Sequence, residues 1–306
     1  MATQAELIVD ARNATGECPV WVSSEQALYW VDIPARQLLR WDAASAEVTR
    51  WTGDEMIACI ARRAGGENRW IVGMESGVFE VIPQADGTLA ATRLASVDHP
   101  RAAMRFNDGR CDRQGRFWAG TMLLDMAAGA SVGSLYRFDG ATEGALKPVL
   151  NDFIVANGLG FSPDGRTMYL SDSHPSVQKI WAFDYDLDDG VPSNRRLFID
   201  MKPLPGRPDG AAVDADGCYW ICGNDAGLIH RFTPEGKLDR SLAVPVKKPA
   251  MCAFGGAGLD TLFVTSIRPE GIDLSDQPLA GGVFALRPGV RGLPEPIFSP
   301  VPVHNF

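Results

Sequence analysis

A chain of 306 residues, 45% hydrophobic and 22% charged, has the composition of a folded globular protein, which excludes a largely disordered one. The net charge of -9 argues against a nucleic-acid partner, because a phosphate backbone would repel the protein. No apolar run reaches the roughly 18 to 20 residues of a membrane helix, and the start, MATQAELIVD, lacks the basic and apolar regions of a signal peptide. We therefore expect a cytoplasmic protein without a membrane partner.

Short runs of β-branched and aromatic residues, separated by turns rich in Gly, Pro, Asp and Asn, follow one another along the chain with almost no helical periodicity. Six of these runs resemble one another: ALYWVDI, NRWIVGM, GRFWAGT, RTMYLSD, CYWICGN and DTLFVTS. They align on six anchor positions, Asp32, Gly73, Gly120, Asp172, Gly223 and Ser266, at separations of 41, 47, 52, 51 and 43 residues. Such a period, with about four strands per unit, is typical of a β-propeller. The sequence therefore predicts an all-β, six-bladed β-propeller as a single domain over residues 1–306.

The early segment AELIVDAR lies outside these six units. We expect it to pair with the last blade and close the ring, because a closed ring leaves few exposed sheet edges. Two stacked β-sandwiches are the main alternative fold, and the regular repeat argues against them.

Six cysteines lie in apolar segments. Cys218 and Cys222 are four residues apart on an expected strand, but no second pair completes a metal cage. We therefore expect free thiols that behave as small core side chains. The six are Cys18, Cys59, Cys111, Cys218, Cys222 and Cys252.

Fifteen residues before each anchor, the chain carries a position that should face the central channel, because the first strand of a blade lines it. These positions are Glu17, Ala58, Arg105, Asn157, Pro208 and Met251, and Asp209 lies one residue beyond Pro208. Glu17, Asn157 and Asp209 would thus bring oxygen-bearing side chains from three blades to one place. The one-residue offset at Asp209 requires a bulge or a gap in the alignment.

Two carboxylates at the axis of a buried channel repel each other unless a cation lies between them. All-oxygen ligands favour Ca²⁺, Mg²⁺ or Mn²⁺, and Ca²⁺ fits best by ligand type, with Zn²⁺ and Fe²⁺ as further possibilities. Three protein ligands leave room for water and substrate, as a catalytic site requires. Taken singly, each of the three residues could equally cap a strand or stabilise a turn. Their matched positions favour one divalent metal site made by Glu17, Asn157 and Asp209.

The stretch RFNDG places Arg105 in the same register and Asn107 on the same strand face. A cation and an amide beside a metal suit an oxygen-rich ligand. Asp108, followed by Gly109, is more typical of a turn. Asp32 and Asp172, at the anchors themselves, are expected to stabilise the blades.

Several blocks of the chain resemble the regucalcin (senescence marker protein) and gluconolactonase family. They are GECPVWVSSEQALYWVDIPARQLLRW, RFNDGRCDRQGRFWAGTM, ANGLGFSPDGRTMYLSDS and PDGAAVDADGCYW. The resemblance implies a six-bladed propeller with a divalent metal in its channel. It assigns metal ligation to Glu17, to Asn157 of NGL and to Asp209 of PDG, and substrate binding to Arg105 and Asn107. An acidic residue after the AGTM block contacts sugar in some members; here it is Asp125, where the animal proteins have Glu.

We therefore expect a metal-dependent sugar lactonase that hydrolyses sugar-acid lactones to open-chain aldonic acids, acting as a monomer or weak oligomer. The metal would polarise the lactone carbonyl and Asp209 would act as general base. Arg105, Asn107 and Asp125 would hold sugar hydroxyls, and residues 123–132 would form a lid. An organophosphate or arylester hydrolase stays open as an alternative on the same fold. So do a calcium-binding regulatory protein without a primary enzymatic role and a protein-binding propeller.

Overall fold

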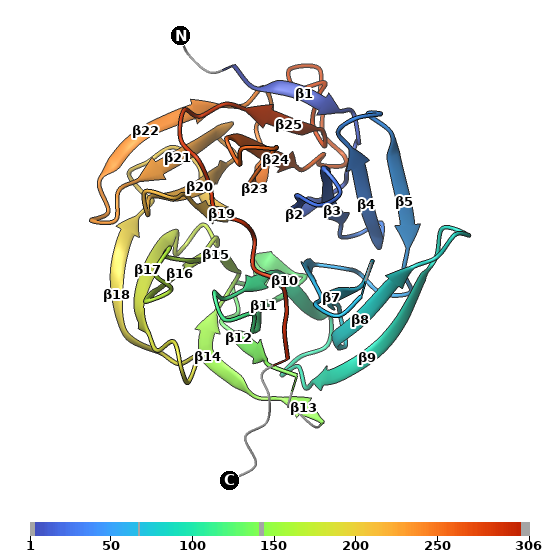
Figure 1. Ribbon diagram of the computed structural model, residues 1–306. Helices are drawn as coiled ribbons and strands as arrows, with labels where there is room; N and C mark the ends of the chain where they lie inside the picture. Colours follow the sequence, from blue (N-terminus) through green and yellow to red (C-terminus); the bar gives the residue numbers. More distant parts are fainter. Residues whose placement is uncertain (1–3, 67, 141–143, 301–306) are drawn as a thin grey trace.

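Six antiparallel blades surround a central channel, which confirms the predicted all-β propeller (Figure 1). The computed structural model describes residues 4–66, 68–140 and 144–300. From the channel outward, blade 1 contains β2 (Gly16–Val22), β3 (Ala27–Asp32), β4 (Gln37–Asp42) and β5 (Val48–Thr52), and blade 2 contains β6 (Cys59–Arg62), β7 (Trp70–Gly73), β8 (Gly77–Pro83), β9 (Leu89–Val97) and β13 (Ala145–Leu146). In the same order, blade 3 contains β10 (Met104–Cys111), β11 (Phe117–Leu123), β12 (Gly133–Phe138) and β14 (Pro148–Phe153), and blade 4 contains β15 (Ala156–Phe161), β16 (Thr167–Asp172), β17 (Lys179–Tyr185) and β18 (Pro192–Asp200). Blade 5 contains β19 (Arg207–Val213), β20 (Tyr219–Asn224), β21 (Leu228–Phe232) and β22 (Leu238–Ala243), and blade 6 contains β23 (Pro249–Gly255), β24 (Thr261–Ser266), β25 (Val283–Leu286) and β1 (Glu6–Val9).

The repeat runs are the second strands of the blades, and their large side chains pack between neighbouring sheets. Trp30, Trp70, Trp118 and Trp220 come from four of these strands and are fully buried. All six cysteines are free and buried, as predicted. Burial of these aromatic and aliphatic side chains removes large apolar areas from water and stabilises the packing of one blade on the next.

Two anchor carboxylates stabilise the blades, as expected from the sequence. Asp32 accepts hydrogen bonds from the backbone of Ala14 and Thr15 at 2.9 and 3.0 Å. Asp172 accepts from the backbone of Ile154 and Val155 at 2.7 and 3.2 Å. Each carboxylate therefore fixes the chain just before the inner strand of its own blade, where the candidate site residues begin.

The ring is closed by strand β1, as predicted. β1 is the outermost strand of blade 6 and pairs with β25 through the register Glu6↔Ala285 and Leu7↔Phe284. Blade 2 differs from the expected four strands, because β13, from the connection between β12 and β14, pairs in parallel with its outer strand β9. Both pairings cover a sheet edge that would otherwise present unpaired backbone groups.

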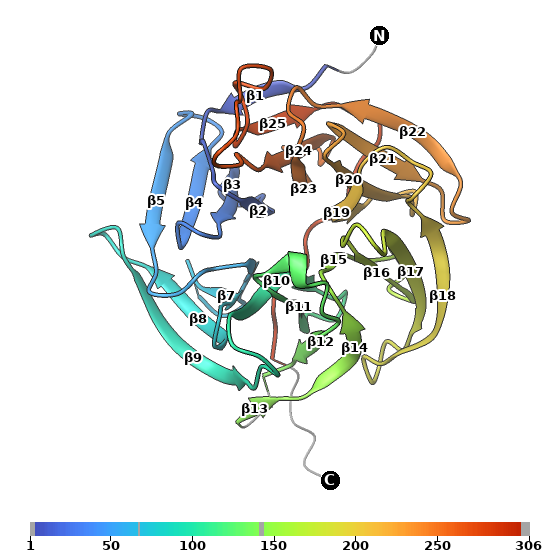
Figure 2. The ribbon, with the colours of Figure 1, turned by 180° about the vertical axis from the view of Figure 1, so that it is seen from behind.

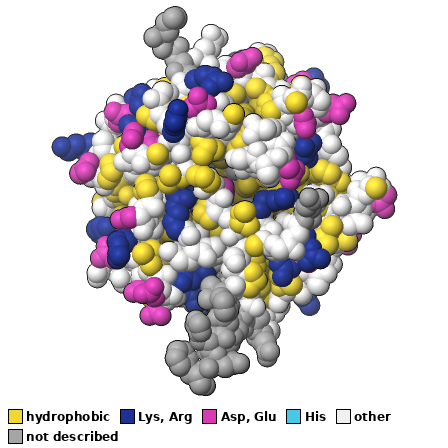
Figure 3. Space-filling view, viewed as in Figure 1, with side chains coloured by type: hydrophobic (Ala, Val, Ile, Leu, Met, Phe, Trp, Pro, Cys, Tyr) yellow, Lys and Arg dark blue, Asp and Glu magenta, His cyan; other side chains and the backbone are white. Residues whose placement is uncertain are grey.

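A C-terminal strap, residues 287–300, crosses one end of the channel (Figure 1). Gly292 pairs with Asp214 of blade 5, and Phe298 pairs with Arg63 of blade 2. The Phe298 ring also stacks on Phe138 of blade 3, with centroids 5.4 Å apart. Acidic and basic side chains are interspersed over this face of the molecule (Figure 3). The strap therefore ties several blades together and covers this end of the channel.

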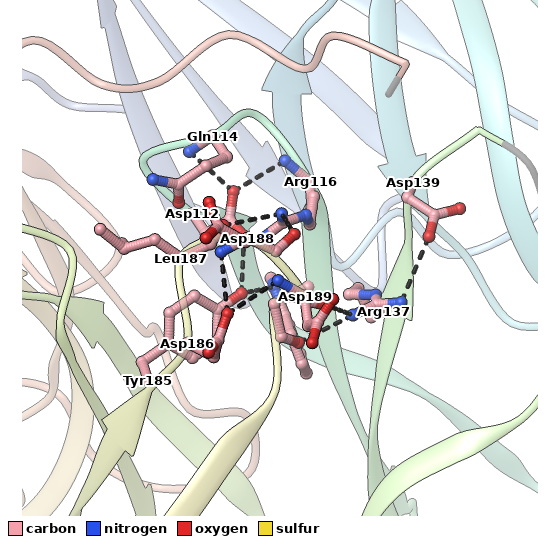
Figure 4. Close-up of polar contacts among 12 residues, drawn as sticks. Asp112, Gln114, Arg116, Arg137, Asp139, Tyr185, Asp186, Leu187, Asp188 and Asp189 are labelled. Atoms are coloured by element: carbon pink, nitrogen blue, oxygen red, sulfur yellow. Dashed lines mark hydrogen bonds and ion pairs between the residues drawn. The ribbon is translucent and has the colours of Figure 1, made fainter. Parts of the chain in front are cut away.

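Blades 3 and 4 are joined near the strap by a polar network (Figure 4). Arg116 donates to the carbonyl oxygens of Leu187 and Asp188, both in the loop after β17. The Tyr185 hydroxyl donates to Asp112 Oδ2 at 2.6 Å, and Arg116 pairs with the same carboxylate at 3.2 Å. The acidic stretch of this loop is therefore held by arginine from the neighbouring blade.

Helix is confined, within the described ranges, to one short 3-10 turn, η1 (Met126–Ala128). None of the described helices has the length and apolar character required to span a membrane.

Candidate functional site

A cavity of about 320 Å³ opens at the end of the channel opposite the strap. Its lining comes from the starts of inner strands and from the ends of second strands with the residues that follow them, whereas the strap contacts the opposite ends of inner strands such as β10 and β19. Figure 2 shows this second face, with η1 lying over the channel beside β10. The lining residues are Thr15, Glu17, Arg105, Asn107, Met122, Leu124, Met126, Val155, Asn157, Ser173, Arg207, Asp209, Asn224, Lys248, Ile267 and Pro269. The cavity thus combines a charged and amide-rich floor with an apolar wall on the side of blades 3 and 4.

Glu17 is the second residue of β2, and a tight local geometry places it at the cavity. A Cβ atom on the preceding Gly16 would lie 2.9 Å from the carbonyl oxygen of Ser266 and 2.7 Å from Asn13 Nδ2, so only glycine fits there. The pairing of β2 with β3 is irregular directly after Glu17, where Cys18 has a positive φ of 48°. The strand start TGECPVW therefore carries Glu17 into the channel between neighbouring blades.

Asn157 and Asp209 occupy the same register as Glu17 in their own blades. The residue before each of them pairs with the anchor of the blade: Gly16↔Asp32, Ala156↔Asp172 and Pro208↔Gly223. The one-residue offset of Asp209 in the sequence therefore comes from a shorter connection between β19 and β20, that is, from a gap in the alignment. Irregular pairing follows the site position in all three blades and does not distinguish blade 5.

Asp209 is the centre of a hydrogen-bonded network on the cavity floor. Asn157 Nδ2 donates to its Oδ1 at 2.6 Å, and Asn224 Nδ2 donates to its Oδ2 at 2.5 Å. Asn157 Nδ2 also lies 2.9 Å from the hydroxyl of Ser173, which in turn donates to the Pro208 carbonyl oxygen. The carboxylate is therefore fixed in orientation by amides from two blades.

Arg105 and Asn107 form a second polar group on β10. Arg105 Nη1 donates to Asn107 Oδ1 at 2.8 Å, and Asn107 Nδ2 donates to the Ala156 carbonyl oxygen of blade 4 at 3.0 Å. Burial lowers the pKa of Arg105 to about 10, while the negative charges of Glu17 and Asp209 act to raise it. Arg105 therefore remains a cation at neutral pH and faces the two carboxylates.

Asp108 is not part of a turn, and that expectation was wrong. It lies inside β10, is fully buried, and accepts a hydrogen bond from the Leu159 backbone at 2.8 Å. The pairing of β10 with β11 is interrupted between Phe106 and Gly109, so Asp108 lies in an irregular stretch of strand. The Asp-Gly sequence at this irregularity is the same as that of many turns. Burial raises its pKa, and its charge acts on both Glu17 and Asp209.

The charged forms of Glu17 and Asp209 are electrostatically unfavourable in this buried site. Burial raises the pKa of Glu17 well above its ordinary value, and the charges of Asp209 and Asp108 raise it further. Burial also raises the pKa of Asp209 to about 6, against the opposing effect of the Asn224 amide. A cation between them would relieve both effects.

The residues present fit a divalent cation. Oδ1 of Asn157 and Oδ1 of Asn224 are buried and find no hydrogen-bond partner in the described part of the chain, an arrangement that is costly unless something binds there. Among the described residues no group of three or more His, Cys, Asp or Glu side chains could hold a metal. A cation here would therefore depend on amide oxygens together with Glu17 and Asp209, which are donors that Ca²⁺ accepts readily.

Asp125 is not brought into the cavity. It is exposed and precedes η1, where its side chain makes no capping hydrogen bond. Its neighbours Leu124 and Met126 do line the cavity, and both are more than 40% exposed. The segment expected to act as a lid therefore lies over the site and presents apolar side chains to it.

Five polar lining residues were missed from the sequence: Thr15, Ser173, Arg207, Asn224 and Lys248. Ser173 and Asn224 each come one residue after an anchor, so the end of the second strand was a signal that could have found them. Arg207 and Lys248 each precede or begin an inner strand, at a position that the repeat alignment left unexamined.

Comparisons with known proteins identify the family of this chain. Residues 15–268 match the model of the SMP-30/Gluconolactonase/LRE-like region. The chain is 40% identical to a 6-deoxy-6-sulfogluconolactonase from Pseudomonas putida, over 95% of this chain and 97% of that protein. It is 34% identical to regucalcin from Gallus gallus, over 96% and 97%. A solved structure of a calcium-binding protein, regucalcin, from Agrobacterium tumefaciens has a TM-score of 0.88 at 26% identity, covering 98% of both chains. The chain therefore belongs to the SMP-30/gluconolactonase/LRE-like family.

Proposed function

We propose that this protein is a sugar lactonase that hydrolyses sugar-acid lactones to open-chain aldonic acids with the help of one divalent cation. The observation that carries the proposal is the cavity floor, where two mutually repelling carboxylates lie beside two buried amide oxygens that have no hydrogen-bond partner within residues 4–66, 68–140 and 144–300. Its membership of a family that includes lactonases supports the same chemistry. Glu17, Asn157 and Asp209 would hold the cation.

The cation would supply electrostatic polarisation of the lactone carbonyl. Arg105 and Asn107 would bind the sugar hydroxyls, since a guanidinium keeps several N–H donors beyond those used within the protein. Met122 and Val155 would contact the less polar face of the sugar ring from the apolar wall. The substrate would thereby lie with its carbonyl toward the floor of the channel.

Asp209 would take a proton from the attacking water. The water oxygen adds to the carbonyl carbon, and the bond from that carbon to the ring oxygen then breaks. The proton held by Asp209 passes to the departing ring oxygen, which becomes a hydroxyl, so atoms and charges balance. The amides of Asn157 and Asn224 keep the Asp209 carboxylate oriented during both transfers. Beside a cation the Asp209 carboxylate would stay ionised at neutral pH and would be free to accept the proton.

A panel of substrates tests this proposal. We expect hydrolysis of aldonolactones, measured by acid release, to exceed hydrolysis of paraoxon and phenyl acetate, and to be lost in the presence of a chelator. Faster turnover of paraoxon or phenyl acetate than of any aldonolactone would assign the protein to the other hydrolase class.

Calcium binding without a primary catalytic role is a second candidate. The all-oxygen donor set and the similarity to regucalcins favour it. Calorimetric titration with Ca²⁺ combined with the lactone panel separates the two. Tight calcium binding with no turnover of any lactone would favour this second function.

A further inference from the structure

Two cations lie side by side on the cavity wall formed by blades 5 and 6. Arg207 is the first residue of β19, and Lys248 directly precedes β23. Both pair with Asp225: Arg207 Nε lies 2.6 Å from Oδ2, and Lys248 Nζ contacts Oδ1. Two positive charges against one carboxylate leave this wall with a net positive charge.

Asp225 fixes the positions of the Arg207 and Lys248 head groups. Asp225 lies in the tight turn after β20 with a φ of 79°, a left-handed conformation that aspartate adopts less easily than glycine. Burial alone would raise its pKa, but its hydrogen bonds with Arg207 and Lys248 outweigh this effect and lower it. The turn thus presents a charged carboxylate between the two cations and orients both heads.

Both cations retain donors for a ligand. Arg207 uses Nε for Asp225 and Nη1 for the Ser173 carbonyl oxygen at 3.3 Å, out of the five N–H groups of a guanidinium. Lys248 donates one of its three N–H groups to Asp225. Their side chains are only 22% and 26% exposed, so an ion bound there would be partly shielded from water.

The cationic pair lies apart from the proposed reaction centre, on one wall. Arg207 precedes Asp209 by two residues on β19, so their backbones lie about 6.6 Å apart along the strand. The wall on the side of blades 3 and 4 is apolar, with Met122, Leu124 and Met126. An anionic group would therefore be directed to one side of the cavity.

We propose that Arg207 and Lys248, oriented by Asp225, form an anion subsite, so that the preferred lactone carries a sulfonate, phosphate or carboxylate on the carbon farthest from its carbonyl. This inference rests on the proposed lactonase function and narrows its substrate class. The shared chemistry is a compact oxyanion that accepts charge-assisted hydrogen bonds from a guanidinium and an ammonium.

The test compares gluconolactone with its 6-deoxy-6-sulfo and 6-phospho derivatives and with the lactone of glucaric acid, which carries a carboxylate at that carbon. We expect kcat/KM of wild type to be about tenfold or more higher for at least one anionic lactone than for gluconolactone, and the best of the three identifies the oxyanion. Arg207→Gln and Lys248→Gln should each reduce this ratio about tenfold or more, mainly through KM. Lys248→Gln is the more direct variant, because Arg207 also influences the charge of Asp209.

Lys247→Gln is the matched control, since Lys247 is the neighbouring lysine and pairs with Asp276 outside the cavity. It should keep the wild-type ratio. Equal kcat/KM for neutral and anionic lactones, or the same loss in Lys247→Gln, would overturn the subsite. Calorimetry with the open-chain acids gives an independent readout. Tighter binding of 6-sulfogluconate than of gluconate, lost in Lys248→Gln, would support the subsite even if no lactone were hydrolysed, in which case only the lactonase proposal fails.

Discussion

The amide nitrogen of Asn224 lies 2.5 Å from Oδ2 of Asp209, across the pair of inner strands of blade 5. Asn157 donates to the other oxygen of the same carboxylate from blade 4. Asp209 is therefore held at both oxygens, while the side-chain carbonyl oxygens of both asparagines are buried and have no hydrogen-bond partner among the described residues. This relationship makes the floor of the channel rigid where the proposed chemistry takes place.

Loss of the Asn224 clamp should reduce catalysis. A hydrogen bond to a charged group contributes about 1.5–3 kcal/mol, so we expect Asn224→Ala to lower kcat/KM for an aldonolactone by roughly 10- to 100-fold. Asn194→Ala is the matched control, because Asn194 also donates its amide to an aspartate, Asp184, but on the exposed surface. Equal activities of the two variants would show that Asn224 has no part in orienting Asp209.

Removal of divalent ions should abolish lactone hydrolysis. Dialysis against EDTA would leave Glu17 and Asp209 without the proposed cation, which would relieve their repulsion. We expect activity to return on addition of Ca²⁺, Mn²⁺, Zn²⁺ or Fe²⁺ to different degrees. The assay is paired with elemental analysis, and full activity in a preparation shown to be free of metal would contradict metal dependence.

Two isosteric changes should separate ligation from proton transfer. Asp209→Asn keeps an oxygen donor but cannot accept a proton, so we expect kcat at saturating metal to fall by about 10²- to 10⁴-fold. Glu17→Gln should instead weaken metal affinity, with activity partly restored by excess ion. Metal titration and kcat are measured for both variants. Near-wild-type kcat in saturated Asp209→Asn would remove this residue from the role of base.

Arg105 should contribute to substrate binding rather than to metal binding. Arg105→Ala removes the hydrogen bond to Asn107 and a buried cation, and we expect loss of about 1–3 kcal/mol in transition-state binding of polyhydroxylated lactones. Metal content should stay near that of the wild type. Asn107→Ala should behave similarly. Parallel loss of metal in both variants would instead mean that they support the ligands.

The stability of the fold should depend on pH through His230. Its Nδ1 lies 2.8 Å from the Ser241 hydroxyl and its Nε2 2.9 Å from the Pro205 carbonyl oxygen, and burial lowers its pKa below the ordinary 6.5. Below pH 6.5 the unfolded chain binds a proton that the folded chain resists, so this contribution is complete above 6.5 and is lost as pH falls through the folded-state pKa.

We therefore expect the free energy of unfolding, from urea titrations between pH 5 and 7, to fall less steeply with acidification in His230→Gln than in wild type. His174→Gln is the control, since the hydrogen bond of the His174 ring with Ser176 is exposed to solvent. An unchanged slope in His230→Gln would exclude this histidine as the source.

The fold could be predicted from the sequence because each blade repeats the same sequence pattern, in which a turn is followed by an aromatic-rich strand that ends at the anchor residue. Alignment on the anchors placed Glu17 and Asn157 in one register and Asp209 one residue beyond it, and the structure brings these three side chains into one cavity. A one-residue difference in the connection of blade 5 is invisible until the strand pairing is known.

Other site features depend on geometry that a repeat does not encode. Asp108 followed by Gly109 has the composition of a turn, and only the irregular pairing of β10 shows that it is buried strand. Asn224 is the last residue of β20 and Ser173 directly follows β16, and in these second strands the pattern indicated only blade packing. Asp225 of blade 5 pairs with Arg207 of the same blade and with Lys248 of blade 6. The distances between these residues along the sequence do not indicate that their side chains meet.

The pairing of β1 with β25 also sets an order for folding during synthesis. β1 (Glu6–Val9) is synthesised long before its partner β25 (Val283–Leu286). At roughly 5–20 residues per second, β1 remains an unpaired edge for on the order of tens of seconds while blades 1 to 5 are completed. Closing so long a loop is entropically costly and slow, so the nascent chain is exposed to aggregation at both ends of the ring.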